Sequence, residues 1–325
     1  MTQPPDQRWS IEERTGPDPT RLASDVRAGL KQTPVSIPPK WFYDEKGSQL
    51  FDDITDLPEY YPTRTEQAIL QAHAFELPRV DTLVELGAGY SRKTRLLLEA
   101  LTRGERPLLF VPLDVAAEPL RDAATRITAD FPTVTVTGVV ADFDDELTPL
   151  PGAPGTRMVA FLGSTIGNLT PEPRREFLER LHRATDPGDW FLLGADLVKD
   201  SGRLVRAYDD SAGVTAAFNK NVLQVLAREL DADLDPDDFD HVARYDTALD
   251  RIEMRLRARR SLVVHLRALD LEWRIAAGEE ILTETSAKFR VEGLRSELSA
   301  AGFEVATTWT DPAGDFSLTL ARRTP

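Results

Sequence analysis

The sequence contains no cysteine and no long apolar run. Without cysteine the chain has no disulfide, no thiolate metal site and no cysteine nucleophile. No stretch approaches the roughly 20 apolar residues that a membrane-spanning helix needs. Residues 1–15 lack the basic start and apolar core of a signal peptide, so we interpret them as a loose leader. Together these absences predict a cytoplasmic protein that does not enter a membrane.

Positive charge is also scarce. The 325 residues include 39 Lys and Arg against 54 Asp and Glu, which gives a formal net charge of −15 at pH 7. Such a charge repels a phosphate backbone, so we expect no nucleic-acid partner. The most acidic run, residues 231–240, does not fit a calcium loop, because Pro236 and Val242 occupy the positions where an EF-hand needs Gly and Glu. No metal site is predicted.

Between residues 64 and 198, apolar runs alternate with amphipathic segments. Thr63 and Glu66 have the spacing of a capping box, which predicts a helix that starts there. The strands that we expect after it are Thr82–Leu86, Leu108–Leu113, Val134–Val140, Met158–Leu162 and Trp190–Leu193. The intervening helices that we expect are Lys93–Leu101, Ala117–Asp130 and Pro171–Ala184. Apolar strands that alternate with helices predict a doubly wound, mostly parallel sheet covered on both faces.

The rhythm changes after residue 198. Val214–Leu230 has a helical pattern, and Arg251–Ile275 alternates with the period of two that is typical of antiparallel strands. A helix over Val291–Ala301 and a final antiparallel pair restore the first pattern. We therefore predict an α/β fold with two domains. The first comprises residues 64–198 plus 289–325, and the second, of α+β type, comprises residues 16–63 plus 199–288.

Polar side chains follow the first four strands of the predicted sheet. Gly87 and Gly89 form a glycine turn after the first strand, where a ligand can approach the backbone, although such a turn can also be a simple tight connection. Asp114 ends the second strand and can accept hydrogen bonds from ribose hydroxyls. Asp142-Phe143 ends the third and suits an adenine amino group and ring face, and a polar loop over residues 163–168 follows the fourth. These strand ends predict a nucleoside site.

The nucleotide is more consistent with S-adenosylmethionine than with NAD. A dinucleotide fingerprint needs a third small residue for close packing of the helix, and Arg92 stands at that position. S-adenosylmethionine needs only one adenosine pocket, and its sulfonium favours an acidic site. We therefore expect a methyl donor as the cofactor.

Several longer stretches resemble the histidine Nα-methyltransferases of ergothioneine biosynthesis. They are PPKWFYD, GSQLFDDIT, LPEYYPTRTE, FLGSTIGNLTP, DLVKDSGRLVRAYDDSAGVTAAFN and LTETSAKFR. The resemblance extends from about residue 20 to the end of the chain. It implies a Rossmann-like class I methyltransferase domain, a substrate domain built from the N-terminal segment and an insertion, and trimethylation of the α-amine of L-histidine to give hercynine.

The resemblance also implies a set of site residues. The donor site comprises Gly87, Lys93, Asp114, Asp142 and Phe143, to which the glycine turn adds Gly89. The histidine site comprises Tyr60, Asn168, Tyr208, Glu284, Thr285 and Ser286, with Tyr43, Thr215, Phe218 and Met254 lining the pocket. We expect Asn168, Tyr208 and Tyr43 to act in catalysis. Tyr90 departs from the family pattern, because a small residue is expected there.

The chemistry of these residue types suits methyl transfer to an amine. Asn168 can donate to the substrate carboxylate and accept from its amine, and Tyr208 can donate a second hydrogen bond to the carboxylate. Glu284 can accept from an imidazole N–H while Ser286 serves the other ring nitrogen. The amine must lose its proton before it attacks; no histidine base is evident, so a pocket tyrosine or water is expected to carry the proton.

Two other functions fit the sequence. The chain could methylate a different amino acid, or it could bind the donor without turnover. Identification of the product by mass, with each amino acid as acceptor, separates these possibilities. We expect a monomer.

Overall fold

The computed structural model describes residues 8–14, 19–89, 91, 93–142, 147 and 149–325. The chain divides into two compact units, each with its own hydrophobic core. Unit 1 comprises Met1–Gly16, Pro62–Val198 and Phe289–Pro325, and unit 2 comprises Pro17–Tyr61 and Lys199–Lys288. Within the described ranges, no helix combines the length and the apolar character needed to cross a membrane.

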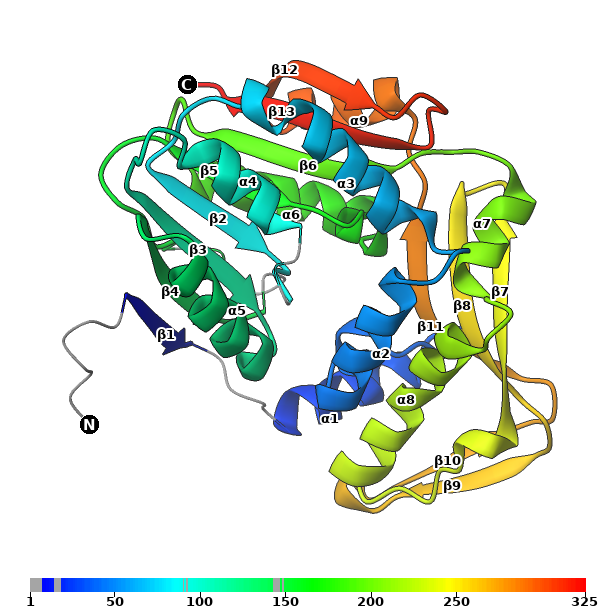
Figure 1. The fold of residues 1–325 in the computed structure, drawn as a ribbon. Helices are drawn as coiled ribbons and strands as arrows, with labels where there is room; N and C mark the ends of the chain where they lie inside the picture. The colour runs from blue at the N-terminus through cyan, green and yellow to red at the C-terminus, as the bar shows by residue number, and fades with distance from the viewer. Residues whose placement is uncertain (1–7, 15–18, 90, 92, 143–146, 148) are drawn as a thin grey trace, which may run out of the picture. The chain divides into compact units, whose positions relative to one another are not determined.

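Unit 1 is built on an eight-stranded sheet with the order β1-β4-β3-β2-β5-β6-β13-β12 (Figure 1). The strands are β1 (Trp9–Glu13), β2 (Thr82–Leu86), β3 (Leu108–Asp114), β4 (Val134–Val140), β5 (Arg157–Phe161), β6 (Trp190–Asp196), β12 (Phe303–Thr310) and β13 (Phe316–Arg323). Neighbours from β1 to β6 are parallel, and β13 and β12 are antiparallel additions. The chain reverses its direction of winding between β2 and β5. In open α/β sheets such a reversal opens a crevice at the carboxyl ends of the strands.

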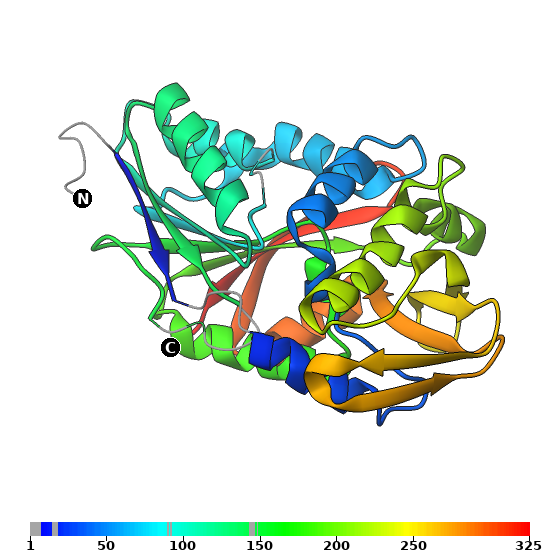
Figure 2. The ribbon, with the colours of Figure 1, turned by 90° about the horizontal axis from the view of Figure 1, so that it is seen from below.

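Helices cover both faces of this sheet. The helices are α3 (Tyr61–His73), α4 (Thr94–Leu101), α5 (Ala117–Asp130), α6 (Pro171–Ala184) and α9 (Val291–Ala300). The side view shows α3, α4 and α5 on one face and α6 and α9 on the other (Figure 2). Every residue of β2 is buried, as expected for a central strand covered on both faces. The doubly wound architecture predicted from the alternation of apolar runs is confirmed.

The first strand corrects the expectation of a loose leader over residues 1–15. Trp9–Glu13 forms β1, which pairs in parallel with β4 at one edge of the sheet. Ile11 packs against a small apolar cluster that includes Val140. Gly138 leaves room for it, because a Cβ there would lie 2.5 Å from Ile11 Cδ1. The segment forms a strand because the Ile11 side chain, in its middle, packs against the Val140 cluster in the space that Gly138 leaves open.

Helix α3 corrects the predicted capping box. The helix begins at Tyr61, so Thr63 lies inside its first turn rather than before it. Glu66 is fully buried and does not cap the helix. Its spacing from Thr63 fits a cap, but its carboxylate has partners elsewhere in unit 1, described in the next subsection.

The chain leaves unit 1 after Val198 and re-enters it at Phe289, and these two points are adjacent. Leu197 and Phe289 form an isolated parallel bridge. The backbone N–H of Val198 donates to the carbonyl of Phe289 at 2.9 Å, and the N–H of Phe289 donates to the carbonyl of Asp196 at 2.8 Å. The two ends of the intervening segment are therefore hydrogen-bonded to each other inside unit 1.

Unit 2 combines helices with two small antiparallel sheets. The helices are α1 (Pro19–Gly29), α2 (Glu45–Thr55), α7 (Ser201–Tyr208) and α8 (Val214–Glu229). The strands are β7 (Phe239–Asp246), β8 (Arg251–Ala258), β9 (Leu262–Leu266), β10 (Leu271–Ile275) and β11 (Glu280–Ala287). The three-stranded sheet has the order β11-β8-β7, and β9 pairs with β10. The antiparallel strands predicted over Arg251–Ile275 are present, but β8 pairs with β7 and β11 rather than with the strand that follows it.

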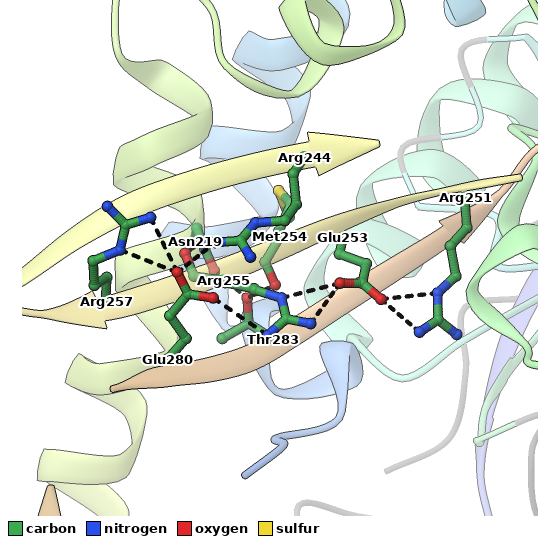
Figure 3. A network of polar contacts seen from close by, with 9 residues as sticks. All are labelled: Asn219, Arg244, Arg251, Glu253, Met254, Arg255, Arg257, Glu280 and Thr283. Atoms are coloured by element: carbon green, nitrogen blue, oxygen red, sulfur yellow. Dashed lines mark hydrogen bonds and ion pairs between the residues drawn. The ribbon is translucent and has the colours of Figure 1, made fainter. Parts of the chain in front are cut away.

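The two faces of the three-stranded sheet differ sharply in chemistry. One face carries Met254 and its buried apolar neighbours. The other carries a network of ion pairs centred on Glu253 and Glu280 (Figure 3). The guanidinium groups around the two carboxylates belong to Arg244, Arg251, Arg255 and Arg257. Burial raises the pKa of Glu253. Hydrogen bonds from Arg255 and Arg251 outweigh that effect and hold the pKa below its usual value. This network ties β7, β8 and β11 together from the side opposite the apolar core.

We predict that Ile11→Ala lowers the free energy of unfolding by about 1–2 kcal/mol, less than for a fully buried isoleucine. The loss comes from apolar contacts between β1 and the cluster around Val140. Glu12→Ala is the matched control, because Glu12 is exposed on the same strand. Urea unfolding of the three proteins measures the difference. Equal stability of Ile11→Ala and wild type would show that β1 adds nothing to the fold.

Candidate functional site

The glycine turn lies at the carboxyl end of β2, beside the end of β3. Gly87 and Gly89 have positive φ angles of 68° and 49°, which glycine adopts at no steric cost. The backbone N–H groups of Gly87 and Ala88 both donate to the carbonyl of Leu113, at 2.8 and 3.1 Å. The Asp114 Oδ2 atom accepts a hydrogen bond from the N–H of Gly89 at 2.8 Å. Asp114 thus fixes the shape of the glycine turn through its carboxylate.

Asp114 is suited to bind hydroxyl groups. Burial raises its pKa, and hydrogen bonds from the backbone N–H groups of Ala116 and Gly89 offset part of that rise. A carboxylate in such a place gains from further donors, which the two hydroxyls of a ribose supply. Asp142 lies at the end of the neighbouring strand β4 and is buried. Phe143, predicted to stack on adenine, lies outside the described residues, as do Tyr90 and Arg92.

Lys93 is held by a buried carboxylate that the sequence analysis assigned to a helix cap. Its Nζ atom forms an ion pair with Glu66, which is fully buried. The same carboxylate accepts hydrogen bonds from the N–H of Gly163 at 2.9 and 3.0 Å. Gly194 makes room for it, because a Cβ there would lie 1.9 Å from Glu66 Oε1. Glu66 therefore joins the start of α4 to the loop after β5, a link that no sequence pattern signals.

Asn168 lies in unit 1, in the short 3-10 helix Thr165–Asn168 (η3) that follows Gly163. Ser164, just before η3, adopts a left-handed conformation with φ 59°. Its hydroxyl accepts a hydrogen bond from the N–H of Asp196 at 2.9 Å, which ties the loop to β6. The loop is therefore joined to β5, which it follows, and hydrogen-bonded to β6 beside it. The role of Asn168 in binding histidine stays a prediction.

In unit 2, Tyr208, Ser286 and Lys288 form a closed triangle of hydrogen bonds. The Tyr208 hydroxyl donates to Ser286 Oγ at 2.9 Å. The Lys288 ammonium donates to Tyr208 Oη and to Ser286 Oγ, both at 2.9 Å, and lies 4.7 Å from the centroid of the Tyr208 ring. All three side chains are buried. Tyr208 and Ser286 were predicted from the sequence, but Lys288 was not, because a lysine after a strand carries no distinctive signal.

Glu284 lies next to this triangle along β11. Residues 284 and 286 share one face of the strand, and Thr285 projects to the opposite face, where its cross-strand neighbour is Glu253. The structure thus brings Glu284 and Ser286 together but separates Thr285 from them. Burial raises the pKa of Glu284 to about 7, although the positive charge of Lys288 opposes the rise. Glu284 therefore changes between its charged and neutral forms close to neutral pH.

The remaining predicted substrate residues belong to the core of unit 2. The rings of Tyr60 and Tyr208 are 6.2 Å apart and meet edge to face. Phe218 is almost fully buried, with ring centroids 5.5 Å from Tyr43 and 4.7 Å from Phe42. Met254 and Thr215 are also buried. Their part in lining a substrate pocket stays a prediction.

A chain of hydrogen bonds holds the backbone of Tyr208, and the sequence analysis did not find it. Thr283 Oγ1 donates to Asn219 Oδ1 at 2.6 Å, and the Asn219 amide reaches His241 Nδ1 at 2.8 Å. The other ring nitrogen, His241 Nε2, lies 2.8 Å from the carbonyl of Tyr208. Burial lowers the pKa of His241, so the neutral ring, with Nε2–H as the donor, satisfies every contact. Figure 3 shows Asn219 and Thr283 beside Met254.

No group of three or more His, Cys, Asp or Glu side chains with the arrangement of a metal site occurs in the described part of the chain. The polar groups described in unit 1 are carboxylates and Lys93, and those in unit 2 are hydroxyls, Glu284 and Lys288. They are suited to hydrogen bonding and charge pairing with organic ligands.

Strand order and site chemistry together define the class of protein. A parallel sheet that reverses between β2 and β5, with a glycine turn after β2 and a carboxylate after β3, is the fold of class I S-adenosylmethionine-dependent methyltransferases.

Residues 22–323 match the family described as histidine-specific, S-adenosylmethionine-dependent methyltransferases. The chain is 57% identical over 305 residues to the histidine N-alpha-methyltransferase of Mycolicibacterium smegmatis, covering 93% of this chain and 95% of that one. It is 54% identical over 321 residues to the enzyme of the same name from Mycobacterium tuberculosis, covering 97% and 100%. Ergothioneine biosynthesis protein 1 of Schizosaccharomyces pombe is 28% identical over 308 residues, covering 90% of this chain and 39% of that one. The chain belongs to this histidine-specific methyltransferase family, and the resemblance inferred from its sequence is confirmed.

We predict that Asp114→Ala weakens binding of S-adenosylhomocysteine by roughly tenfold to a hundredfold, the cost of losing a charged hydrogen-bond acceptor. Part of the loss comes from the glycine turn, which loses the bond to Gly89. Asp122→Ala, on the exposed side of α5, is the control and leaves affinity unchanged. Titration calorimetry measures both. Unchanged affinity of Asp114→Ala would remove Asp114 from the donor site.

Proposed function

We propose that this protein transfers methyl groups from S-adenosylmethionine to the α-amino nitrogen of L-histidine, three in succession, to give hercynine, the first step of ergothioneine biosynthesis. The single observation that carries the proposal is that Glu284 and Ser286 lie on the same face of β11, in a chain of this family. A carboxylate and a hydroxyl two residues apart match a flat ring with a nitrogen on each side.

The donor is assigned to unit 1. Asp114 binds the ribose hydroxyls, Asp142 and Phe143 bind the adenine, and the turn at Gly87 and Gly89 lets the amino-acid part of the donor approach the backbone. Lys93, oriented by Glu66, supplies a positive charge for the donor's carboxylate. Each of these roles follows from the chemistry of the side chain and its place at the carboxyl edge of the sheet.

The histidine side chain is assigned to Glu284 and Ser286. Glu284 accepts from the ring N–H, and Ser286 binds the other nitrogen. An amino acid with an apolar ring leaves both groups unpaired in a buried place, and such unmatched polar groups give hydrogen-bonding pockets their selectivity. Tyr60, Thr215, Phe218 and Met254 are proposed to shape the pocket around the ring, and Thr285 to contribute through its backbone.

The α-amino and carboxylate groups are assigned to Asn168 and Tyr208. The Tyr208 hydroxyl donates its only proton to Ser286, so the substrate carboxylate takes its donor from Asn168, and Tyr208 serves as an acceptor for the amine. Methyl transfer needs the neutral amine, held in line with the sulfonium methyl, and most of the acceleration comes from that positioning. Tyr43 or a water carries the amine proton away.

Incubation of the protein with S-adenosylmethionine and each amino acid in turn tests the proposal. The expected product is histidine with three added methyl groups, identified by mass, together with S-adenosylhomocysteine. Preferential methylation of another amino acid would move the assignment to a different substrate. Donor binding without any methylated product would contradict the enzymatic role altogether.

We also propose that the protein acts as a cytoplasmic monomer with no nucleic-acid partner. The formal net charge of −15 at pH 7 disfavours a phosphate backbone, and the absence of cysteine is consistent with a reducing compartment.

We predict that kcat/KM for histidine rises between about pH 6 and pH 9, since only the neutral amine attacks. A second contribution is centred near pH 7, because the pKa of Glu284 is about 7 and the protonated carboxyl is a weaker acceptor for the ring N–H than the carboxylate. Glu284→Gln removes the contribution near pH 7 and leaves the amine contribution. Initial rates at saturating donor measure both profiles. Superimposable profiles for the two proteins would exclude ionisation of Glu284 from substrate recognition.

We predict that Glu284→Ala lowers kcat/KM for histidine by roughly tenfold to a hundredfold, because the ring N–H loses its acceptor in a closed pocket. Bulkier apolar rings gain relative to histidine, most of all when Met254, which opposes Glu284 across the strands, is also replaced by alanine. Affinity for S-adenosylhomocysteine is the control and stays at the wild-type value. If competition between amino acids still favours histidine to the wild-type extent, the ring is bound elsewhere.

A further inference from the structure

The Ser286 hydroxyl has two hydrogen-bond partners among the described residues, and both are donors to it. Tyr208 Oη donates at 2.9 Å, and Lys288 Nζ donates at 2.9 Å. A serine hydroxyl has two lone pairs and one proton. When both lone pairs accept hydrogen bonds, the only capacity left to Ser286 is donation of its own proton.

Lys288 sets the direction of the two bonds that it makes in this triangle, and the third runs from Tyr208 to Ser286. An ammonium group has donors and no acceptor, so it can only donate to Tyr208 and to Ser286. Tyr208, which accepts from Lys288, uses its own proton for Ser286. Replacing the lysine by a side chain with no donor would open one lone pair of Ser286, which could then accept from a ligand. Lys288 itself is buried with an exposed fraction of 4%, so its charge is held close to these oxygens rather than in solvent.

We propose that Lys288 is a specificity-determining residue that makes Ser286 an obligate hydrogen-bond donor, so that the pocket accepts only a ring with one N–H and one bare nitrogen. The inference rests on the proposed function, in which Glu284 and Ser286 bind the histidine ring. Glu284 takes the N–H, and Ser286 donates to the lone pair of the other nitrogen. The pocket therefore recognises neutral imidazole in a single tautomer.

As a result, the pocket distinguishes ring nitrogens with and without a proton, which a freely rotating serine hydroxyl would not do. A hydroxyl that is free to rotate can accept or donate, and so it binds a ring nitrogen with or without a proton. With its lone pairs occupied, Ser286 faces a second ring N–H with no acceptor. The imidazolium form and any ring with N–H groups on both sides are then disfavoured.

Other charged groups near Ser286 and Tyr208 fix the conditions of a test. On the same strand, Glu284 has a pKa of about 7 and is ionised above it. From β8, Glu253 faces the opposite side of the sheet and is bound by Arg251 and Arg255. From β7, His241 bonds to the backbone of Tyr208 and not to its hydroxyl. Measurements at pH 8.5 therefore keep Glu284 ionised and the imidazole of free histidine neutral.

The test compares two ligands of the whole chain in the presence of S-adenosylhomocysteine. One is L-histidine, and the other is its uncharged 2-oxo derivative, whose ring has an N–H on both sides and no bare nitrogen. Titration calorimetry gives the ratio of the two dissociation constants for wild type, Lys288→Met, Lys288→Arg and Tyr208→Phe. The steric effect of the added oxygen is common to all four proteins, so changes in the ratio report on the hydrogen bonds.

We expect wild type to favour histidine strongly and Lys288→Met to reduce that preference by about tenfold, the effect of one unpaired polar group. Tyr208→Phe reduces it as well without any change of charge, because it opens one lone pair of Ser286. Lys288→Arg, which keeps a donor-only cation, retains the wild-type preference.

An unchanged ratio in Tyr208→Phe, with wild-type affinity for S-adenosylhomocysteine, would overturn the proposal even if Lys288→Met does not fold. A folded Lys288→Met with an unchanged ratio would overturn it in the same way. Failure of the wild-type protein to bind or methylate histidine would instead contradict the proposed function, and that outcome is visible before any variant is made.

Discussion

Unit 1 depends on one buried carboxylate. Glu66 has no exposed surface, and a charge in that position is tolerated only when it is paired and hydrogen-bonded. Its partners are the ammonium of Lys93 and the N–H of Gly163, which come from two different segments at the carboxyl edge of the sheet. Loss of the Lys93 ammonium would leave an uncompensated charge in the interior, and loss of the Gly163 N–H would leave the carboxylate short of a donor. Helix α3, the start of α4 and the loop after β5 are therefore fixed in relation to one another.

The parts of unit 1 that local pattern determines were predictable from the sequence. The bounds of β2, β4, α5 and α6 agree with the expected ranges, because each is a run with one clear period between distinct end signals. The glycine turn and Asp114 were also identified, since strand ends in a parallel sheet meet at one edge. What local pattern does not encode is a contact between distant segments, and so Glu66 was interpreted as a helix cap.

The sheet of unit 2 was harder to predict for the same reason. Period-two alternation identified strands over Arg251–Ile275, but it does not specify partners, and β8 pairs with strands on either side of a separate hairpin. The resemblance to known enzymes supplied Tyr208, Glu284 and Ser286 as residues. The structure adds that the hydroxyls of Tyr208 and Ser286 are bonded to each other, a contact between distant segments that the resemblance did not supply.

The bridge between Leu197 and Phe289 lies where the inserted segment, residues 199–288, joins unit 1. All of the inserted segment, including Tyr208, Glu284, Ser286 and Lys288, lies between two points that are already hydrogen-bonded to each other in unit 1. A segment attached in this way can lengthen, shorten or be replaced without opening the sheet that carries the donor residues. The side chains proposed to bind the histidine ring can therefore change while the eight-stranded sheet of unit 1 keeps its fold.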